Sequence, residues 1–373
     1  MRYSPFRHLG SIFRAKDPIQ LTVFLTRRCN AKCSFCFYLS REGEDNPKEL
    51  SLDEFQKISS SIGNLLWLAF SGGEIFLRED LVEIVSLFYR NNKPAIILLP
   101  TNGLLPEKIY RNTEAILKNC PNSTVTVKLS LDGPENIHDK LRGVEGAFNK
   151  VLFCYQTLAP LLKKYRNFEL GINTVFCAEN QDRMTETIKL VRGLKKIRAH
   201  TVSLIRGEVG DENLKKVEMD KYKAASKLLE DNLKKSLAAR YSFPGAVLKA
   251  AQDIVQRKMI YRTTVENSCQ LTCQAGRLTA VITETGDVYP CESFQDKLGN
   301  LRASGYDLPQ ILGNEKSREV KADIKKNRCY CTHECNMMMN ILFNPGQYPA
   351  LFREYARLQA GPPPSFYVNR PSS

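Results

Sequence analysis

The sequence lacks long hydrophobic runs and any recognisable export signal. Its longest apolar stretches, NLLWLAF and PAIILLP, have the length of strands and fall far short of the ~18 residues of a membrane span. The N-terminal stretch MRYSPFRHLGSIFRAKD has no hydrophobic core of a secretory signal. These two absences exclude a helical membrane protein and favour a cytoplasmic location.

Acidic residues are in short supply. The 373 residues include 54 Lys and Arg against 40 Asp and Glu, a net charge of +14. Such an excess indicates an acidic partner, although basic residues scattered over a solvated surface would explain it equally well. No aromatic-basic box accompanies the charge, which argues against nucleic acid. We therefore expect an anionic small molecule, such as a phosphorylated sugar or a lipid head group, as the substrate.

Cysteine, by contrast, is plentiful and unevenly placed. Without an export signal, 12 cysteines argue against a disulfide scaffold. Nine of them fall into two groups, which indicates metal chemistry. The first group contains Cys29, Cys33 and Cys36, and the second contains Cys269, Cys273, Cys291, Cys329, Cys331 and Cys335. Single buried core positions explain Cys120, Cys154 and Cys177 best.

The hydrophobic pattern predicts strands that alternate with helices. The expected strands cover residues 19–26, 65–70, 94–100, 123–131, 168–176 and 200–205. Six such units imply a parallel sheet with right-handed crossovers, so we expect an α/β fold built as a partial (β/α)6 TIM-like barrel. A small cysteine-rich α+β extension follows, in which RLTAVITETGDVYPCE is typical of a β-hairpin.

The predicted domain boundaries follow this division. The expected segments are an N-terminal segment (1–18), the barrel (19–210), a helical connector (211–262), the cysteine-rich region (263–345) and a C-terminal helix with a loose tail (346–373).

Unusual polar residues follow each of the first four strands. The cysteine loop follows the first strand, SGGE the second, TNG the third and SLDG the fourth. In parallel barrels the carboxyl ends of the strands form the active face, so these residues are expected to meet at one mouth.

The loop from Phe24 to Ser40 carries three cysteines spaced C-x3-C-x2-C. A zinc site with a distant fourth ligand, a closed four-thiolate iron-sulfur cluster, or a [4Fe-4S] cluster with one open iron would each use three thiolates here. An open iron that binds an amino acid needs partners for its ammonium and carboxylate. Glu74 suits an amine, with Gly72 and Gly73 allowing close backbone approach, and Arg142 suits a carboxylate.

The loop, with Phe35 before its last cysteine, together with Gly72-Gly73-Glu74 after the second strand, resembles the radical S-adenosylmethionine (radical SAM) superfamily over residues 18–206. The resemblance implies that S-adenosylmethionine fills the open iron site. It also implies that a reduced cluster cleaves this molecule to a 5′-deoxyadenosyl radical, which takes hydrogen from a substrate. A low-potential flavodoxin or ferredoxin would supply the electron. The residues that we expect around S-adenosylmethionine, besides those named above, are Asn102, Ser130, Asp132, Asn173 and Arg206.

The second cysteine group resembles the SPASM/Twitch extension of that superfamily, in the segments CQAGRLTAVITETGDVYPC and RCYCTHEC. The sequence contains only part of the full SPASM cysteine pattern. The six cysteines of this group cannot supply all the ligands of two [4Fe-4S] clusters. The resemblance implies one auxiliary [4Fe-4S] cluster on Cys273, Cys291, Cys331 and Cys335, with Cys269, Cys329 and His333 as alternatives. A structural zinc is the competing interpretation.

Other functions stay open at this stage. Radical modification of a peptide, by oxidation, cross-linking or epimerisation, is the alternative to a small-molecule substrate. Cys177, after the fifth strand, is a candidate hydrogen-atom donor for epimerisation, although core packing explains it equally well. A non-enzymatic iron-sulfur electron carrier or redox sensor is the alternative of a different class.

Overall fold

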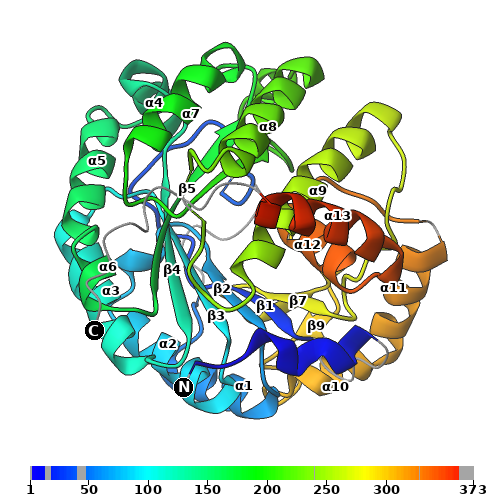
Figure 1. The fold of residues 1–373 in the computed structure, drawn as a ribbon. Coiled ribbons are helices and arrows are strands. Elements are labelled where there is room, and N and C mark those ends of the chain that lie inside the picture. The colour runs from blue at the N-terminus through cyan, green and yellow to red at the C-terminus, as the bar shows by residue number, and fades with distance from the viewer. Residues whose placement is uncertain (1, 13–17, 40–47, 239, 327, 361–373) are drawn as a thin grey trace.

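The protein forms a partial barrel whose strands are covered on the outside by helices (Figure 1). The computed structural model describes residues 2–12, 18–39, 48–238, 240–326 and 328–360. The loose tail predicted at the C-terminal end of the chain, from residue 360 to 373, lies outside these residues except for Ala360.

One mixed sheet runs through the described residues in the order β6-β5-β4-β3-β2-β1-β7-β8-β9. Neighbours from β6 to β7 pair in parallel, and the last two pairs are antiparallel. The strands are β1 (Gln20–Phe24), β2 (Trp67–Ser71), β3 (Ile96–Thr101), β4 (Thr124–Ser130), β5 (Phe168–Phe176), β6 (Ala199–Leu204), β7 (Thr279–Ile282), β8 (Asp287–Tyr289) and β9 (Gly299–Asn300). The predicted α/β fold with six parallel strands is confirmed, with strand ends shifted by at most two residues.

The crossover and covering helices alternate with the strands. The α-helices of the barrel are α1 (Leu52–Ser61), α2 (Leu81–Asn92), α3 (Pro106–Asn119), α4 (Glu135–Arg142), α5 (Ala147–Leu158), α6 (Leu161–Lys164) and α7 (Met184–Gly193). The later ones are α8 (Met219–Lys234), α9 (Ala246–Glu266), α10 (Leu308–Gly313), α11 (Glu315–Lys326), α12 (Glu334–Leu342) and α13 (Tyr348–Ala360). Short 3-10 turns are η1 (Pro5–Ile12), η2 (Ile75–Leu77), η3 (Gln181–Arg183), η4 (Glu212–Lys215) and η5 (Pro345–Gln347).

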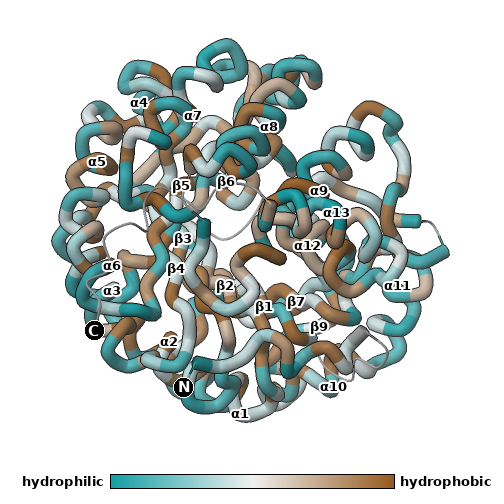
Figure 2. The backbone as a smooth tube through the Cα atoms, in the orientation of Figure 1, coloured by the Kyte–Doolittle hydropathy of each residue, from teal (hydrophilic) through white to brown (hydrophobic). Residues whose placement is uncertain are grey.

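Local sequence explains where these elements begin. Helix α1 starts at a complete capping box, in which the Ser51 hydroxyl accepts from the Glu54 amide and the Glu54 carboxylate accepts from the Ser51 amide. Strand β1 is buried along its whole length, as expected for a strand covered on both faces. Figure 2 shows hydrophobic residues gathered on the strands, with hydrophilic residues dominating the outer helices.

The C-terminal hairpin continues the barrel sheet instead of forming a sheet of its own. Strand β7 pairs with β1 in parallel, in a register that sets Gln20 opposite Thr279 on one side and Trp67 on the other. The first cysteine group follows β1, and Cys291 of the second group follows β8, which only β7 separates from β1 in the sheet.

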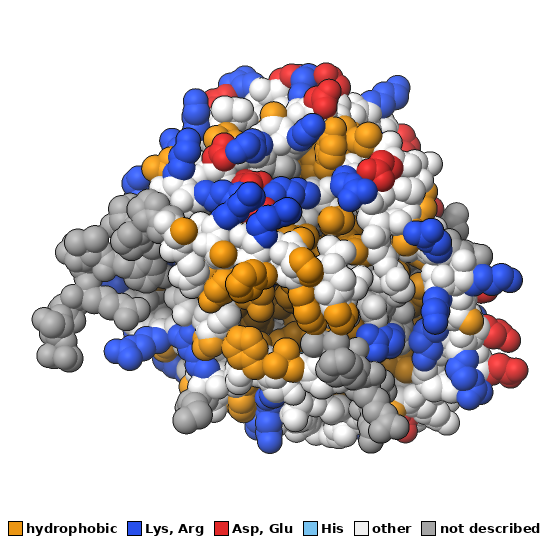
Figure 3. Space-filling model, turned by 45° about the vertical axis from the view of Figure 1, so that its right-hand side comes forward, with side chains coloured by type: hydrophobic (Ala, Val, Ile, Leu, Met, Phe, Trp, Pro, Cys, Tyr) orange, Lys and Arg blue, Asp and Glu red, His pale blue; other side chains and the backbone are white. Residues whose placement is uncertain are grey.

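An apolar groove lies on the side of the molecule formed by η1, α9 and α13 (Figure 3). Its open volume is about 630 Å³, and exposed Phe6, Leu9 and Phe352 line it. Phe243, which also lines the groove, packs with Ile19 and Leu66 before the strands begin. The groove thus belongs to the end of the barrel opposite the cysteine loop. None of the helices in the described part of the chain has the length and apolar character of a membrane span.

Candidate functional site

The cysteine loop is held in place by backbone contacts to two neighbouring elements. The amide of Gly73 donates to the Thr26 carbonyl at 2.7 Å, which ties the loop to the end of β2. The amide of Lys32 donates to the carbonyl of Arg142, the last residue of α4, at 3.0 Å. The loop therefore has a defined path across the mouth of the barrel, with its three thiols partly exposed.

Close packing against this loop explains the two glycines of the SGGE motif. A Cβ atom on Gly73 would come within 2.1 Å of the Arg28 carbonyl oxygen, and one on Gly72 within 2.4 Å of the Thr26 carbonyl oxygen. Gly72 also has a φ of +135°, which favours glycine. From the sequence, Gly72 and Gly73 were expected to let a ligand come close to the backbone. In the structure they let the backbone of the cysteine loop come close.

Glu74 lies buried beneath the loop, at 1 % exposure. Its carboxylate accepts hydrogen bonds from the Thr101 hydroxyl at 2.9 Å, the Asn102 amide at 2.8 Å and the Phe76 amide at 3.2 Å. Burial raises the pKa of Glu74 to about 7, against the opposing effect of these donors. Glu74 thus ties β2 to β3, and its contact with a bound amine stays a prediction.

Two polar groups point hydrogen-bond donors at the thiols. The Asn102 side-chain amide lies 3.8 Å from Cys29 Sγ, and Arg142 Nη1 lies 3.6 Å from Cys33 Sγ. Burial raises the pKa of Cys29 to about 11, with Glu74 and the other two thiols adding to the effect. Iron binding requires the thiolate form, and donors directed at the sulfur favour that form. The donor set therefore suits a cluster held by Cys29, Cys33 and Cys36.

Arg142 and Asp132 form a buried ion pair behind the loop. Arg142 Nε and Nη2 lie 2.7 and 2.6 Å from Asp132 Oδ2, and the guanidinium carbon lies 5.1 Å from the centre of the Phe35 ring. The other Asp132 oxygen accepts from the Val175 amide at 2.9 Å. Burial opposes ionisation of Asp132, but the charge of Arg142 together with hydrogen bonds, including the one from Val175, keeps its pKa low. Both residues thus have protein partners, and their expected contacts with S-adenosylmethionine stay predictions.

The remaining cavity residues lie on one inner face of the barrel. Ser130 ends β4, and Asn173 lies within β5, three residues before its end. The Ser203 hydroxyl of β6 donates to Asn173 Oδ1 at 3.1 Å. The structure therefore brings these residues to the interior of the barrel, below the cysteine loop.

Arg206 connects the two cysteine regions. Its guanidinium carbon lies 4.5 Å from the centre of the Phe37 ring in the first loop. Its Nη2 lies 2.9 Å from Glu292 Oε2 and 2.6 Å from His333 Nε2, both next to cysteines of the second group. Burial opposes its charge, but Glu292, Glu334 and Cys335 together outweigh that effect and raise the pKa of Arg206. Phe37 and Glu292 were not recognised from the sequence, although their positions beside Cys36 and Cys291 were a signal.

Four cysteines of the second group interact with one another. A hydrogen bond with Cys273 lowers the pKa of Cys329 to about 7 and raises that of Cys273. Burial raises the pKa of Cys331 to about 11, and the thiols of Cys291 and Cys329 add to it. These mutual effects favour Cys273, Cys291, Cys329 and Cys331 as neighbouring sulfur donors.

Cys335 has different neighbours. Burial raises its pKa to about 12, and the charges that act most strongly on it belong to Glu292, Arg206, Glu334 and Lys128, not to another cysteine. Its sulfur, a Glu292 oxygen and a His333 nitrogen lie within 4.8 Å of one another. Because Arg206 contacts the same carboxylate and imidazole, this group does not suit a cation. The predicted ligand set of Cys273, Cys291, Cys331 and Cys335, with Cys329 as an alternative, stays a prediction; the neighbours of Cys335 favour the alternative.

Cys269 and Cys177 also differ from the cluster cysteines. The Cys269 thiol donates to the Leu271 carbonyl at 3.2 Å. Cys177 is fully buried and packs with Phe35 and Ile205. Burial raises the pKa of Cys177 to about 11. Core packing therefore accounts for Cys177.

Comparison with known proteins identifies the family. The model of the radical SAM superfamily matches residues 23–191, and the model of the SPASM iron-sulfur cluster-binding domain matches residues 273–336. The chain belongs to the radical SAM superfamily. These matches confirm the predicted [4Fe-4S] clusters and S-adenosylmethionine as its cofactors, and they confirm that it is an enzyme.

Two curated relatives and one solved structure illustrate the similarity. Fe-coproporphyrin III synthase of Methanosarcina barkeri is 36% identical over 39% of this chain and 35% of its own length. The sporulation killing factor maturation protein SkfB of Bacillus subtilis is 34% identical over 49% of this chain and 42% of its own. The structure of anSMEcpe with bound AdoMet matches with a TM-score of 0.56 at 21% identity, over 92% of this chain and 98% of that one, and supports the fold. The chain thus spans less than half of the length of these two relatives.

Proposed function

We propose that this radical SAM protein reductively cleaves S-adenosylmethionine and uses the resulting radical to abstract hydrogen from a substrate. The observation that carries the proposal is the three-thiol loop at the mouth of the barrel, with Asn102 and Arg142 directed at two of its sulfurs. When bound to Cys29, Cys33 and Cys36, a [4Fe-4S] cluster with one open iron would supply the electron for cleavage of S-adenosylmethionine to methionine and a 5′-deoxyadenosyl radical. The protein would hold the cluster, exclude water and orient the substrate.

Cys29, Cys33 and Cys36 would hold that cluster. The Gly72-Gly73 turn and the buried Glu74 would fix the loop against β2 and β3, and the Arg142–Asp132 pair would fix it against α4 and β5. A flavodoxin or ferredoxin is the proposed electron donor. The donors directed at the sulfurs would stabilise the thiolate charge when iron is bound.

The auxiliary cluster would bind to Cys273, Cys291, Cys329 and Cys331. Their mutual electrostatic interactions support this set, and the contacts of Cys335 with Glu292 and Arg206 speak for a different role. Arg206 lies between this region and the first loop, so the substrate would be held between the two clusters. A cluster held by these four cysteines would supply an electron acceptor for a net oxidation of the substrate.

The proposed substrate is an anionic small molecule, such as a phosphorylated sugar or a lipid head group. The positive charge of the chain supports this class. Modification of a peptide is the second candidate, because similarity to SkfB and to the fold of SuiB, solved with its precursor peptide SuiA, favours it. Mass spectrometry of products formed from candidate compounds of both classes would distinguish the two.

The first experiment is anaerobic reconstitution followed by analysis of iron and sulfide. We expect about eight irons in the wild type and about four in the triple Ala variant of Cys29, Cys33 and Cys36. With dithionite and S-adenosylmethionine, the wild type alone should form 5′-deoxyadenosine. Clusters that neither bind nor cleave S-adenosylmethionine would contradict the proposal and favour an electron carrier.

The auxiliary ligand set is tested with two matched variants. We expect C329A to lose the auxiliary cluster, so that iron falls from about eight to about four, and C335A to retain it. The reverse result would restore Cys335 as the fourth ligand. Zinc in place of iron at this site would remove the proposed oxidation step.

A further inference from the structure

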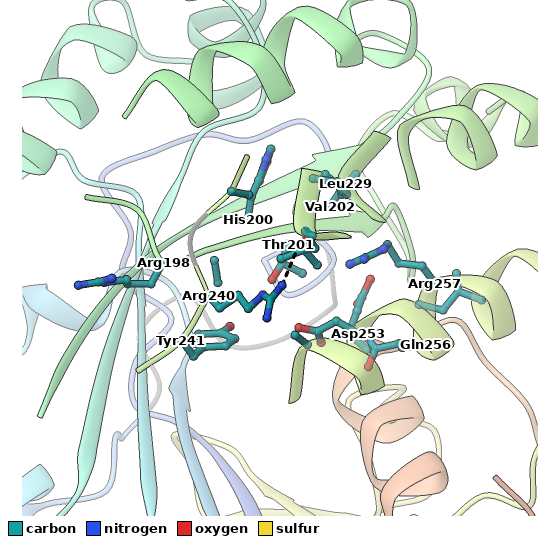
Figure 4. A pocket seen from close by; sticks show the side chains of 16 residues that line it. Arg198, His200, Thr201, Val202, Leu229, Arg240, Tyr241, Asp253, Gln256 and Arg257 are labelled. Atoms are coloured by element: carbon teal, nitrogen blue, oxygen red, sulfur yellow. Dashed lines mark hydrogen bonds between the residues drawn. The ribbon is translucent and has the colours of Figure 1, made fainter. Parts of the chain in front are cut away.

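A pocket lies between the free edge of β6 and helix α9, on the open side of the partial barrel (Figure 4). It has an open volume of about 60 Å³. A water-sized site needs about 10–15 Å³ by this measure, so the pocket has room for one small polar group and its hydration, not for a complete substrate.

The pocket is lined by more cations than acids, and two of the cations, Arg240 and Arg257, are buried. Arg198, Arg240 and Arg257 line it, against the two acids Asp253 and Glu334. Figure 4 shows the guanidinium groups of Arg240 and Arg257 directed toward one another across the pocket. Two cationic groups facing each other across a small cavity are suited to an anion between them.

Arg257 provides the strongest evidence for a ligand. It is 8 % exposed, and its Nε and Nη2 have no hydrogen-bond partner among the residues that the structure describes. A buried guanidinium is costly unless it is paired and hydrogen-bonded. Its unpaired donors are therefore available to an acceptor in the pocket.

The acids near Arg257 are engaged with other cations. Asp253 forms an ion pair with Lys249, one turn earlier on α9. Glu230 of α8, which also acts on Arg257, forms ion pairs with Lys234 and Lys258. The protein groups around Arg257 thus leave its charge only partly compensated.

Arg240 presents its charge to the same space. Its Nη1 donates to the Leu358 carbonyl at 3.1 Å, and its Nη2 donates to the Leu233 carbonyl at 3.2 Å. These two bonds hold the guanidinium at the wall of the pocket. Arg240 is accordingly held in position with its positive charge directed at the pocket.

A further cation, Lys128, lies behind the inner wall of the pocket. Lys128 Nζ, on the interior face of β4, donates to the hydroxyl of Thr201, a lining residue, at 2.7 Å. Burial lowers the pKa of Lys128 to about 8. Burial lowers the pKa of His200 to about 3, and the charges of Arg257 and Lys128 contribute to this decrease. The positive potential of these two cations therefore extends across this wall.

The pocket is connected to the mouth of the barrel through charged side chains. Glu334 lines it and lies 3.9 Å from Arg206 Nη1, which in turn contacts Glu292. A group bound in the pocket could therefore belong to a molecule whose remainder extends along the barrel interior toward the cysteine loop.

We propose that this pocket binds an oxyanion of the substrate, a carboxylate or a phosphate, with Arg257 and Arg240 as its ligands. A guanidinium presents paired donors that match the geometry of both groups. The inference rests on the proposed function, because the oxyanion is assigned to the substrate of that reaction. Binding of the oxyanion in this pocket would position the reacting carbon of the substrate relative to the first cysteine loop.

The test measures anion binding directly, by isothermal titration of the reconstituted full-length protein with sodium phosphate and with sodium acetate at constant ionic strength. We expect saturable binding of at least one of them, weakened at least about tenfold by R257Q, because bonds to a charged donor are lost. The matched control is R262Q on the same helix. Arg262 is exposed, and its ion pair within the described residues is with Glu266 at 3.0 Å. The R262Q protein should bind the anions like the wild type. Preference for acetate or phosphate would identify which oxyanion the substrate carries.

Equal binding by wild type and R257Q would overturn the proposal, as would the absence of binding to both probes. If R257Q does not fold, wild-type crystals soaked in phosphate decide: density within hydrogen-bonding distance of Arg257 Nε and Nη2 supports the site, and its absence contradicts it. Formation of 5′-deoxyadenosine by the wild type is measured separately, since failure there counts against the proposed function and not against the oxyanion site.

Discussion

Arg142 joins the buried carboxylate of Asp132 to the sulfur of Cys33. Its Nε lies 2.7 Å from Asp132 Oδ2, and its Nη1 lies 3.6 Å from Cys33 Sγ. The same guanidinium thus neutralises a fully buried acid and directs a donor at a cluster thiol. The stability of the fold and the position of the loop are linked through this residue.

Substitution of Asp132 by Asn should therefore destabilise the protein strongly. Breaking a buried ion pair by removal of one partner costs about 3–5 kcal/mol, because the other charge stays buried. Urea denaturation measures the change in the free energy of unfolding. The control is E179Q, which removes an exposed pair with Lys140 at 2.7 Å and should cost less than about 1 kcal/mol. If D132N and E179Q reduced the free energy of unfolding by similar amounts, the buried ion pair of Asp132 and Arg142 would not have the stabilising role inferred for it.

Gly73→Ala should displace the cysteine loop, since the new Cβ would lie 2.1 Å from the Arg28 carbonyl oxygen. Iron in the reconstituted protein is expected to fall from about eight to about four per chain, with the auxiliary cluster retained. Gly193→Ala is the control, because nothing lies within 4 Å of a Cβ at that helical position. Its iron content should match the wild type. Full iron content in the Gly73→Ala protein would show that the loop adapts to the methyl group.

Cys177 should be inert toward alkylation. It is fully buried, and burial raises its pKa to about 11, so the reactive thiolate is scarce at neutral pH. In the iron-free protein, peptide mass spectrometry after treatment with iodoacetamide should find Cys329, which is exposed, labelled and Cys177 unlabelled. C177A is expected to form product at the wild-type rate. Loss of product formation with 5′-deoxyadenosine retained would instead support Cys177 as a hydrogen-atom donor.

The contact between Glu54 and Arg302 should make stability depend on pH. The bond from Arg302 lowers the pKa of Glu54 from 4.5 to about 2, and Arg302 Nε lies 2.7 Å from its Oε1. Because the folded-state pKa is depressed, the stabilisation is present above about pH 4.5 and is lost as the pH falls toward 2. E54Q should reduce the free energy of unfolding by about 1–3 kcal/mol at pH 7, and this difference from the wild type should shrink at pH 3.

The control for this prediction is E83Q, an exposed acid in the first turn of α2. It should change the free energy of unfolding by less than about 1 kcal/mol at either pH. A difference between wild type and E54Q that is equal at pH 7 and pH 3 would show that the charge of Glu54 contributes nothing.

Local patterns in the sequence determined the barrel and the position of its first cysteine loop. Buried strands read as continuous apolar runs, and Ser51 and Glu54 mark the start of α1, because these signals depend on residues close together in the chain. The spacing of Cys29, Cys33 and Cys36 indicated a cluster site for the same reason.

Only the tertiary structure decided which partners the polar residues have. The pairing of β7 with β1 joins residues about 260 positions apart, and no local periodicity encodes such a pairing or its register. The buried partners of Glu74 and Asp132 come from neighbouring strands and helices, and the interaction of Cys329 with Cys273 depends on how a distant loop folds back. Arg240 and Arg257 face each other across a pocket that is lined by both β6 and α9. From the sequence, α9 was expected to be part of a connector. These partners come from distant parts of the chain, so long-range packing determines them. The interactions of a buried polar side chain depend on such partners more than on its neighbours in the sequence.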